Sequence, residues 1–313
     1  MKTLSILVPC YNEARSLEAL HQEIDHVISS LEDYRWEILF VNDGSRDDTL
    51  EVIRSLRERD PRVSYVDLSR NFGKENAMLA GFDYAKGDAV IIMDADLQHP
   101  PAVIPDMIRK WEEGYDDVYA QRKARGKEPW IRRKMTRVYY RILQDSSKMD
   151  VLPNVGDFRL LDRKCVDALC QMRESGRYTK GMYCFIGFRK TGVEFETHDR
   201  TEGQSSMNFR KLMNLALEGI TSYTTAPLRW ATFIGLLISF FAFAYMVFVL
   251  IKALLYGDPV AGYPTLLTVI LFLGGIQLLT LGIIGEYLAR VFIEVKNRPV
   301  YLIREYKGIE NED

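Results

Sequence analysis

The N-terminal part of the chain alternates between short apolar runs and longer segments in which apolar residues recur at helical spacing. Apolar runs bounded by turn residues predict buried strands, and the 3.6-residue period predicts helices that pack by one face. Strands that alternate with helices indicate an α/β fold with a mostly parallel sheet and helices on both faces. Strands are predicted at 4–9, 36–42, 63–68 and 89–93, and helices at 14–29, 47–59 and 74–85.

Two later segments, 230–251 and 259–285, contain no charged residue. Each exceeds the ~20 residues that cross a bilayer as a helix, although a buried core helix would show the same composition. Only 252–258 separates the two segments, which favours a hairpin of two transmembrane helices. Lys and Arg flank the pair on its outer sides, so the positive-inside rule places the N-terminal domain and both chain ends in the cytosol.

These patterns divide the chain into four parts. We expect a cytosolic α/β domain at 1–207, an interfacial amphipathic helix at 208–227, two transmembrane helices at 228–291 and a cytosolic C-terminal tail at 292–313. No signal peptide is predicted, because the chain passes from Met1 directly into the first strand. The predicted location is the plasma membrane, that is, the inner membrane in a cell with both an inner and an outer membrane.

The net charge and the cysteines narrow the range of partners. The 313-residue chain has a net charge of −2, so no overall basic field predicts a nucleic-acid partner. The four cysteines form no Cys-x-x-Cys pair, which favours reduced thiols over a disulfide framework or a zinc site. Reduced thiols agree with the cytosolic placement of the N-terminal domain.

Asp94-Ala95-Asp96 is the most informative short motif. It follows the apolar run 89–93 directly and precedes a Pro-Pro break. Ligands of open α/β sheets bind at the carboxyl ends of the strands, so both carboxylates are expected in the binding crevice. Paired hard oxygen ligands suit Mg²⁺ or Mn²⁺ that holds a diphosphate. The alternative is a solvated turn that carries two acids.

Three further strand ends, followed by 9–13, 42–45 and 69–74, carry polar residues. In a parallel sheet they would converge on the acidic pair, although each segment alone is equally typical of a turn. Asp43 could accept a hydrogen bond from a nucleobase, Tyr11 could stack on the base, and Lys74 could neutralise phosphate. Neither G-x-G-x-x-G nor the P-loop motif occurs, so a metal ion is expected to meet most of the phosphate charge.

Together these segments resemble the inverting family-two glycosyltransferases, which have the GT-A fold. Within that family the chain resembles the polyprenyl-phosphate glycosyltransferases, near the bactoprenol (undecaprenyl-phosphate) glucosyltransferases and more distantly the dolichyl-phosphate mannose synthases. The similarity runs nearly from end to end. The segments that carry it are 8–13, 41–45, 70–75, 94–98, 156–160, 200–205, 218–222, 285–287 and 296–299.

The resemblance implies a role for each matching position. Asp94 and Asp96 would hold the metal, and Asp96 and Asp157 are the implied catalytic residues. This chain has Ser206 where relatives often carry Lys, so the charge of that loop departs from the family pattern. The residues implied in nucleotide-sugar binding are Pro9, Tyr11, Glu13, Asp43, Lys74, Asp94, Gln98, Arg200 and Ser205.

Asp157 need not act as a general base. The acceptor that the resemblance implies is undecaprenyl phosphate, and the second pKa of such a phosphate is about 6. The phosphate is therefore mostly a dianion at neutral pH and already a competent nucleophile. Asp157 could instead align the acceptor or its cationic partners. A structural turn acid is the remaining alternative.

Basic residues near the membrane face are expected to bind the acceptor phosphate. Arg122 follows a predicted fifth strand at 118–121, and Arg133 and Lys134 lie on a basic amphipathic helix predicted at 130–143. A second amphipathic helix is predicted at 208–222. Such helices suit an anionic membrane surface, although an ordinary surface helix has the same pattern.

The resemblance therefore implies inverting transfer of a hexose to undecaprenyl phosphate at the cytosolic membrane face, with UDP-glucose as the favoured donor. The lipid-linked sugar would serve the modification of a surface glycan. GDP-mannose or a UDP-amino sugar is the nearest alternative donor, and a non-catalytic membrane scaffold is the alternative from another class. A processive synthase is disfavoured because Ala226 stands where the Gln of a Gln-x-x-Arg-Trp motif should be. The sequence also allows a homo-oligomer.

Overall fold

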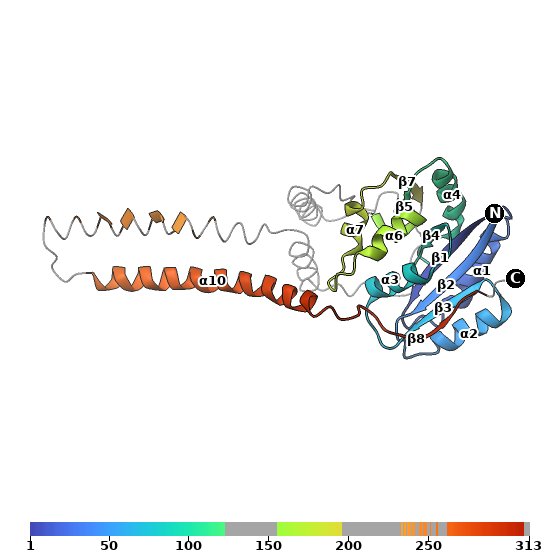
Figure 1. The fold of residues 1–313 in the computed structure, drawn as a ribbon, viewed down its shortest axis with the longest axis horizontal. Coiled ribbons are helices and arrows are strands. Elements are labelled where there is room, and N and C mark those ends of the chain that lie inside the picture. Colours follow the sequence, from blue (N-terminus) through green and yellow to red (C-terminus); the bar gives the residue numbers. More distant parts are fainter. Residues whose placement is uncertain are drawn as a thin grey trace.

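The computed structural model describes residues 1–122, 155–195 and 262–309, together with single positions between 233 and 255. These residues form an α/β domain from which a long helix, α10, extends (Figure 1). The strands are β1 (Lys2–Cys10), β2 (Tyr34–Asn42), β3 (Val63–Leu68), β4 (Ala89–Ile92), β5 (Asp117–Arg122), β6 (Val155–Asp162), β7 (Lys190–Phe195) and β8 (Ile303–Lys307). The helices are α1 (Leu17–Ile28), α2 (Thr49–Arg59), α3 (Lys74–Tyr84), α4 (Ile104–Glu112), α6 (Arg163–Gln171), α7 (Thr179–Phe185) and α10 (Tyr263–Val295), with a 3₁₀ turn at Pro101–Val103.

The strands form one sheet in the order β7-β5-β6-β4-β1-β2-β3-β8. β4, β1, β2 and β3 run parallel to one another, so the mostly parallel α/β sheet that the sequence predicts is confirmed. The predicted strands and helices of this part agree closely with the observed ones. α1 begins later than expected, because residues 13–16 form a turn in which the Ser16 N–H donates to the Glu13 carbonyl (3.1 Å).

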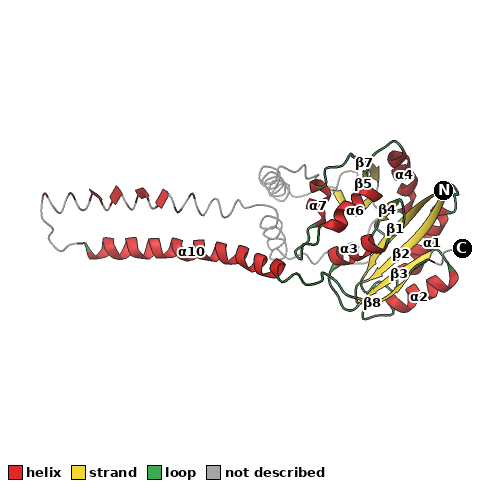
Figure 2. Ribbon diagram, viewed as in Figure 1, coloured by secondary structure: helices red, strands yellow, loops and turns green. Residues whose placement is uncertain are grey.

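Helices cover both faces of the sheet (Figure 2). Successive side chains of a strand point to opposite faces, so Ile6 packs with α1, α2 and α4, while Leu7 packs with α3, α6 and α7. Both side chains are fully buried. This burial on two faces explains why the central strands are continuous apolar runs instead of alternating ones.

β6 enters the sheet in the opposite direction from β4. Ile92, the last residue of β4, pairs with Arg159 of β6. The start of β6 therefore extends past the carboxyl end of β4, which places Asp157 at the same edge of the sheet as Asp94. No local sequence pattern predicts this juxtaposition, because it depends on the pairing of distant strands.

The segment 303–307 forms a strand, β8, within the C-terminal tail predicted at 292–313. β8 runs antiparallel to β3 at the edge of the sheet, and the sequence pattern does not predict this strand. Two residues of this segment, Arg304 and Glu305, are charged and form ion pairs with the domain: Arg304 with Asp67 (3.2 Å) and Glu305 with Arg54 (2.7 Å). A short and highly charged strand gives a weak sequence signal, and contact with the β3 edge decides its structure.

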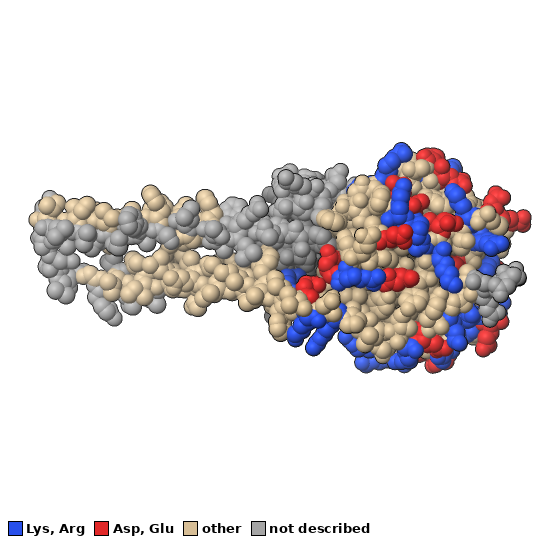
Figure 3. All heavy atoms as spheres, in the orientation of Figure 1, with Lys and Arg blue, Asp and Glu red and all other residues tan. Residues whose placement is uncertain are grey.

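α10 is the long apolar helix of the described residues. Its segment Phe272–Val295 is long and apolar enough to cross a membrane, and none of that window is buried in the protein. Charged side chains crowd the α/β domain, whereas the visible face of α10 carries them only near the domain (Figure 3). The helix continues past the charge-free segment that ends at Gly285. Its last turns carry Glu286, Arg290 and Glu294.

Candidate functional site

The candidate site lies where the parallel strands end. The loop after β1 is fastened to the loop after β2: the Asn12 N–H donates to Ser45 Oγ (3.0 Å), and the Arg46 N–H donates to Asn12 Oδ1 (2.8 Å). The Glu13 N–H donates in turn to Thr49 Oγ1 (2.9 Å) at the start of α2. Asn12 has a φ of +57°, a left-handed conformation that asparagine tolerates better than most residues. These bonds hold the loops after β1 and β2 together at the carboxyl ends of the strands.

Asp43 joins the loop after β3 to the loop after β2. Its two carboxylate oxygens accept hydrogen bonds from the N–H groups of Phe72 (2.7 Å) and Gly73 (2.9 Å). Burial raises the pKa of Asp43 above its ordinary value, against the lowering effect of these two donors. The contact with a nucleobase that the sequence suggests for Asp43 stays a prediction. The observed bonds show that Asp43 positions the residues just before Lys74.

Lys74 forms ion pairs with two carboxylates that lie at the ends of different strands. Its Nζ lies 2.5 Å from Asp94 Oδ1 and 3.0 Å from Asp157 Oδ2. Lys74 is the first residue of α3 and follows Gly73, whose φ is +91°. The ion pairs therefore connect the loop after β3, the end of β4 and the start of β6.

These ion pairs set the charge state of the site. Partial burial lowers the pKa of Lys74, but the charges of Asp157 and Asp94 raise it by more. The pKa of Lys74 therefore lies above its ordinary value. Burial alone would raise the pKa of Asp157, but Lys74 lowers it below its ordinary value. Lys74 is therefore a cation and Asp157 a carboxylate at neutral pH.

Arg159 holds the strand segment that carries Asp157. The Arg159 guanidinium pairs with Asp117 of β5 at 2.9 Å, and both side chains are buried. Arg159 also donates to the carbonyl of Gly156 (3.1 Å), directly before Asp157. A buried ion pair is costly to break by removal of one partner, typically about 3–5 kcal/mol. This pair fixes the start of β6.

Asp94 and Asp96 fit the requirements of a magnesium or manganese site shared with a substrate. Mg²⁺ typically takes one or two carboxylates and completes its shell with substrate phosphates and water. Asp96 is exposed, and its Oδ1 accepts from the Gln98 N–H (3.1 Å). Within the described parts of the chain, no group of three or more His, Cys, Asp and Glu side chains could hold a metal ion by itself. Two carboxylates would leave the rest of a metal's coordination shell to other ligands, such as substrate phosphates or water.

The predicted donor residues lie around this acidic pair. Tyr11 is 43% exposed, so its ring is accessible for stacking. Burial raises the pKa of Glu13, opposed by a hydrogen bond from Ser16 and reinforced by the nearby charges of Asp96 and Asp94. Pro9 lies in β1 one residue before its end. The predicted donor residues that the structure describes thus lie at one edge of the sheet, and their roles stay predictions.

The acceptor residues are only partly within the described part of the chain. Arg122 is the last residue of β5, and Gln121 beside it pairs with Val155 at the start of β6. The backbone of Arg122 therefore lies at the same edge of the sheet as Asp157. The residues outside the described part are Arg133, Lys134, Arg200 and Ser205, together with the helices predicted at 130–143 and 208–222.

Two further residues reach the site. His99 Nδ1 accepts from the Asp94 N–H (3.0 Å), and its ring stacks on Phe158 with 4.8 Å between centroids. Glu75 accepts from the Thr179 N–H (3.0 Å) and so connects α3 to α7. Proximity to the acidic pair was a signal for His99. Glu75 lies in the motif 70–75, but no local pattern assigns it a role.

Comparison with known protein families identifies the class of protein. Residues 5–170, more than half of the chain, match the model described as Glycosyl transferase family 2, and the chain belongs to this family. Residues 226–291 match a second model, the GtrB C-terminal hairpin. The resemblance inferred from the sequence is confirmed. The hairpin match and the apolar α10 together indicate a membrane-associated glycosyltransferase.

Individual relatives are similar over almost their whole length. An uncharacterized glycosyltransferase of Synechocystis sp. is 45% identical over 98% of this chain and 96% of its own. The SfII prophage-derived bactoprenol glucosyl transferase of Shigella flexneri is 43% identical over 96% of this chain and 97% of its own. Among solved structures, glucosyl-3-phosphoglycerate synthase from Mycobacterium tuberculosis, in complex with Mn²⁺ and UDP-glucose, is 16% identical with a TM-score of 0.47, covering 70% of this chain and 77% of its own.

Proposed function

We propose that the protein transfers a glucosyl group from UDP-glucose to bactoprenol phosphate, that is undecaprenyl phosphate, with inversion at the sugar. The observation that carries the proposal is the pairing of Lys74 with Asp94 and Asp157 at the carboxyl ends of the parallel strands. This is the side of the domain from which the hairpin helix, α10, leaves. Relatives named as bactoprenol glucosyl transferases, similar over nearly the entire chain, support the same acceptor and sugar.

The hairpin helix joins the domain on the side of the active edge. The Ser175 N–H donates to Glu294 Oε1 (2.8 Å) near the end of α10. The connection from α10 to β8 passes the end of β3, where the Ser69 N–H donates to the carbonyl of Leu302 (2.8 Å). The amino end of β1 lies on the opposite side of the domain (Figure 1). A lipid phosphate at the bilayer surface would thus meet the carboxyl ends of the strands.

Asp94 and Asp96 would hold Mg²⁺ or Mn²⁺, which when bound would neutralise charge on the diphosphate leaving group. Lys74 adds a fixed cation between the donor side and Asp157. Such preorganised charge is effective because it needs no rearrangement as negative charge moves onto the leaving group. The principal difficulty of the reaction, an anionic nucleophile approaching an anionic diphosphate, is addressed by these groups.

Asp157 aligns the acceptor in this proposal. Its pKa is lowered by Lys74, and the acceptor phosphate is already mostly a dianion above pH ~6. Asp157 Oδ1 is buried and has no hydrogen-bond partner among the described residues, which leaves its capacity to accept a hydrogen bond unused within the protein. The phosphate oxygen would attack the anomeric carbon, and the bond to the nucleoside diphosphate would break on the opposite face.

The membrane placement follows from the same proposal. Two helices of the hairpin would cross the plasma membrane and keep the catalytic domain and both ends of the chain in the cytosol. The charged groups at the end of α10, among them Arg290 and Glu294, would lie at the headgroup level. The nucleotide sugar is cytosolic and the lipid phosphate is held by the bilayer, so this placement brings both substrates to one site.

A donor panel tests the proposed function. Detergent-purified full-length protein is incubated with undecaprenyl phosphate, Mg²⁺ and each of UDP-glucose, UDP-N-acetylglucosamine and GDP-mannose, and lipid products are identified by mass spectrometry. We expect a hexose-phosphate lipid from UDP-glucose, lost in Asp96→Ala. A lipid product from GDP-mannose alone would overturn the proposed donor. No lipid product from any donor would overturn the acceptor.

A further inference from the structure

Glu75 occupies a place in the site that the proposed reaction does not use. It follows Lys74 directly in the first turn of α3. Its Oε2 accepts a hydrogen bond of 3.0 Å from the backbone N–H of Thr179, the first residue of α7. Glu75 and Thr179 are 104 residues apart in the sequence. A hydrogen bond between them does not serve the stability of α3 itself.

α7 also contacts the Asp157 segment by a separate route. The guanidinium of Arg159 lies over the ring of Tyr183 at 3.6 Å, a distance typical of a cation–π contact. Arg159 in turn donates to the carbonyl of Gly156. The helix therefore meets the site twice, at its first residue through Glu75 and one turn later through Arg159.

The segment before α7 is joined to the hairpin helix. Besides the bond from Ser175 to Glu294 (2.8 Å), Arg290 lies beside Gly176, where a Cβ would be in ordinary contact with Arg290 Nη1 at 4.0 Å. α7 thus stands between the end of α10 and the Lys74–Asp157 pair. This is the direction from which a lipid acceptor would arrive.

We propose that Glu75 is a positioning residue for the acceptor: its bond to Thr179 holds the first turn of α7 against the Lys74–Asp157 pair. The inference rests on the proposed function, since it assigns Glu75 to the acceptor side of that site. Loss of the bond lets α7 move away, and the acceptor phosphate is then held less tightly. The donor side, formed by the loops after β1, β2 and β4, is unaffected.

The charges that face Glu75 give the inference a pH signature. They come from Lys74 of the same helix, Asp157 of β6 and Arg177 before α7, while the phenol of Tyr183 on α7 is titratable but stays neutral because burial raises its pKa. Burial, followed by the charge of Asp157, raises the pKa of Glu75 to about 7. Glu75 is therefore neutral below this pH and becomes an anion above it, where it repels the acceptor phosphate. We expect the KM for undecaprenyl phosphate to rise as pH increases through 7.

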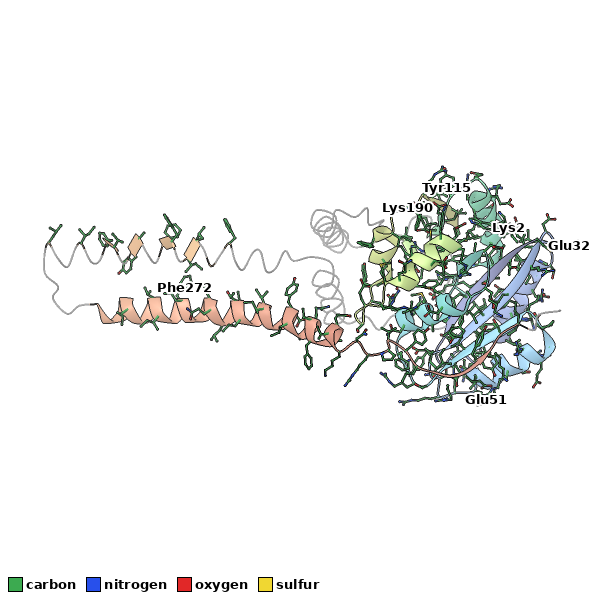
Figure 4. The ribbon with its side chains drawn as sticks, viewed as in Figure 1. Lys2, Glu32, Glu51, Tyr115, Lys190 and Phe272 are labelled. Atoms are coloured by element: carbon green, nitrogen blue, oxygen red, sulfur yellow. The ribbon has the colours of Figure 1, made fainter. Side chains whose placement is uncertain are left out.

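Two substitutions separate the hydrogen bond from the charge. Glu75→Gln keeps an oxygen that accepts from Thr179 and never ionises, whereas Glu75→Ala removes both properties. Glu51→Gln is the matched control, because Glu51 is exposed on α2, away from α10 (Figure 4). For full-length protein in detergent, kcat and the KM of each substrate are measured from pH 6 to 9. Hydrogen exchange of residues 177–185 is measured on the same samples.

Below pH 7, where Glu75 is neutral, Glu75→Ala is expected to raise the KM for undecaprenyl phosphate about tenfold, a loss of the size of one ordinary hydrogen bond. Its KM for UDP-glucose stays near that of the wild type, and exchange in α7 becomes faster. Glu75→Gln is expected to keep wild-type exchange and to lose the rise in KM above pH 7. Glu51→Gln should match the wild type throughout.

Unchanged α7 exchange in Glu75→Ala would overturn the inference, as would a Glu75→Gln variant that behaves like Glu75→Ala. If Glu75→Ala does not fold, Glu75→Gln decides alone through its pH profile, and a persisting rise in KM above pH 7 contradicts the inference. Hydrogen exchange does not depend on turnover. A wild-type protein that forms no lipid product would therefore overturn the proposed function while exchange still tests the role of Glu75.

Discussion

At the scale of single residues, the site depends on backbone space as much as on charged side chains. Gly44 has a φ of +63°, and a Cβ there would lie 2.3 Å from the carbonyl carbon of Arg70 and 2.5 Å from the nitrogen of Asn71. Only glycine lets the loop after β2 approach the loop after β3 so closely. This approach brings the Asp43 carboxylate within hydrogen-bond distance of the N–H groups of Phe72 and Gly73, and these bonds position Lys74.

Gly44→Ala is therefore expected to be damaging. It combines a left-handed conformation, about 1–2 kcal/mol, with a clash against backbone, about 1–3 kcal/mol. Thermal unfolding of the full chain in detergent should begin at a lower temperature, and glucosyl transfer should fall. Gly114→Ala is the matched control, since Gly114 has a φ of +91° but its nearest neighbour would lie 3.7 Å from a Cβ. An equal effect of both substitutions would contradict the role of the close approach.

The sequence predicts individual site residues better than their partners. Asp94 and Asp96 could be predicted because they follow a continuous apolar strand, and the carboxyl end of such a strand faces the crevice. The bridge from Lys74 to Asp157 could not, because it joins residues from α3 and β6 through an antiparallel pairing that leaves no local pattern. Glu75 and Thr179 meet for the same non-local reason.

At the scale of elements, β8 ties the end of the hairpin to the catalytic sheet. Arg304 pairs with Asp67 (3.2 Å), whose side chain is fully buried. Asp67 also accepts from Asn42 Nδ2 (2.8 Å), and Asn42 Oδ1 accepts from the Ser45 N–H (3.2 Å). A chain of hydrogen bonds thus runs from β8 to the loop after β2 in the donor side of the site.

Arg304→Ala leaves the buried Asp67 carboxylate short of one partner. We expect a loss of roughly 1–3 kcal/mol in the free energy of unfolding and faster hydrogen exchange in residues 43–48. Arg54→Ala is the control, because Arg54 of α2 pairs with Glu305 on the same strand β8 in a partly exposed contact, and such pairs contribute about 1 kcal/mol or less. Equal stability of the Arg304→Ala variant and the wild type would show that β8 is not coupled to the site.

The strands differ in how well the local sequence pattern predicts them. The strands β1 to β4 are mainly apolar on both faces, although Ser5, Glu37, Ser64 and Asp67 are buried within them. Turn residues separate these strands from the helices between them, so the pattern alone predicts them. β8 has charged residues at three of five positions, and its strand conformation depends on the free edge of β3. The periodicity of the sequence does not predict the antiparallel position of β6 in the sheet, because its pairing partner β4 lies far away in sequence.

At the scale of the whole molecule, the active edge of the sheet and the end of α10 lie on the same side of the domain. Glu294 contacts Ser175, and the connection after α10 passes the end of β3 on its way to β8. The hairpin is therefore attached at two places near the site. The apolar composition predicts the hairpin, whereas its attachment beside the carboxyl ends of the strands became visible only in the folded chain.

The proposed metal-dependent transfer is tested most directly by measuring glucosylation of undecaprenyl phosphate from UDP-glucose by full-length protein in lipid vesicles. Wild type and Asp96→Ala are compared with Mg²⁺ present, after removal of metal by a chelator, and after addition of Mn²⁺. We expect a glucosylated lipid from the wild type, its loss with the chelator, its return with added metal, and almost none from Asp96→Ala. Undiminished product from Asp96→Ala, or from wild type without metal, would show that Asp96 and a metal ion are not required for the transfer.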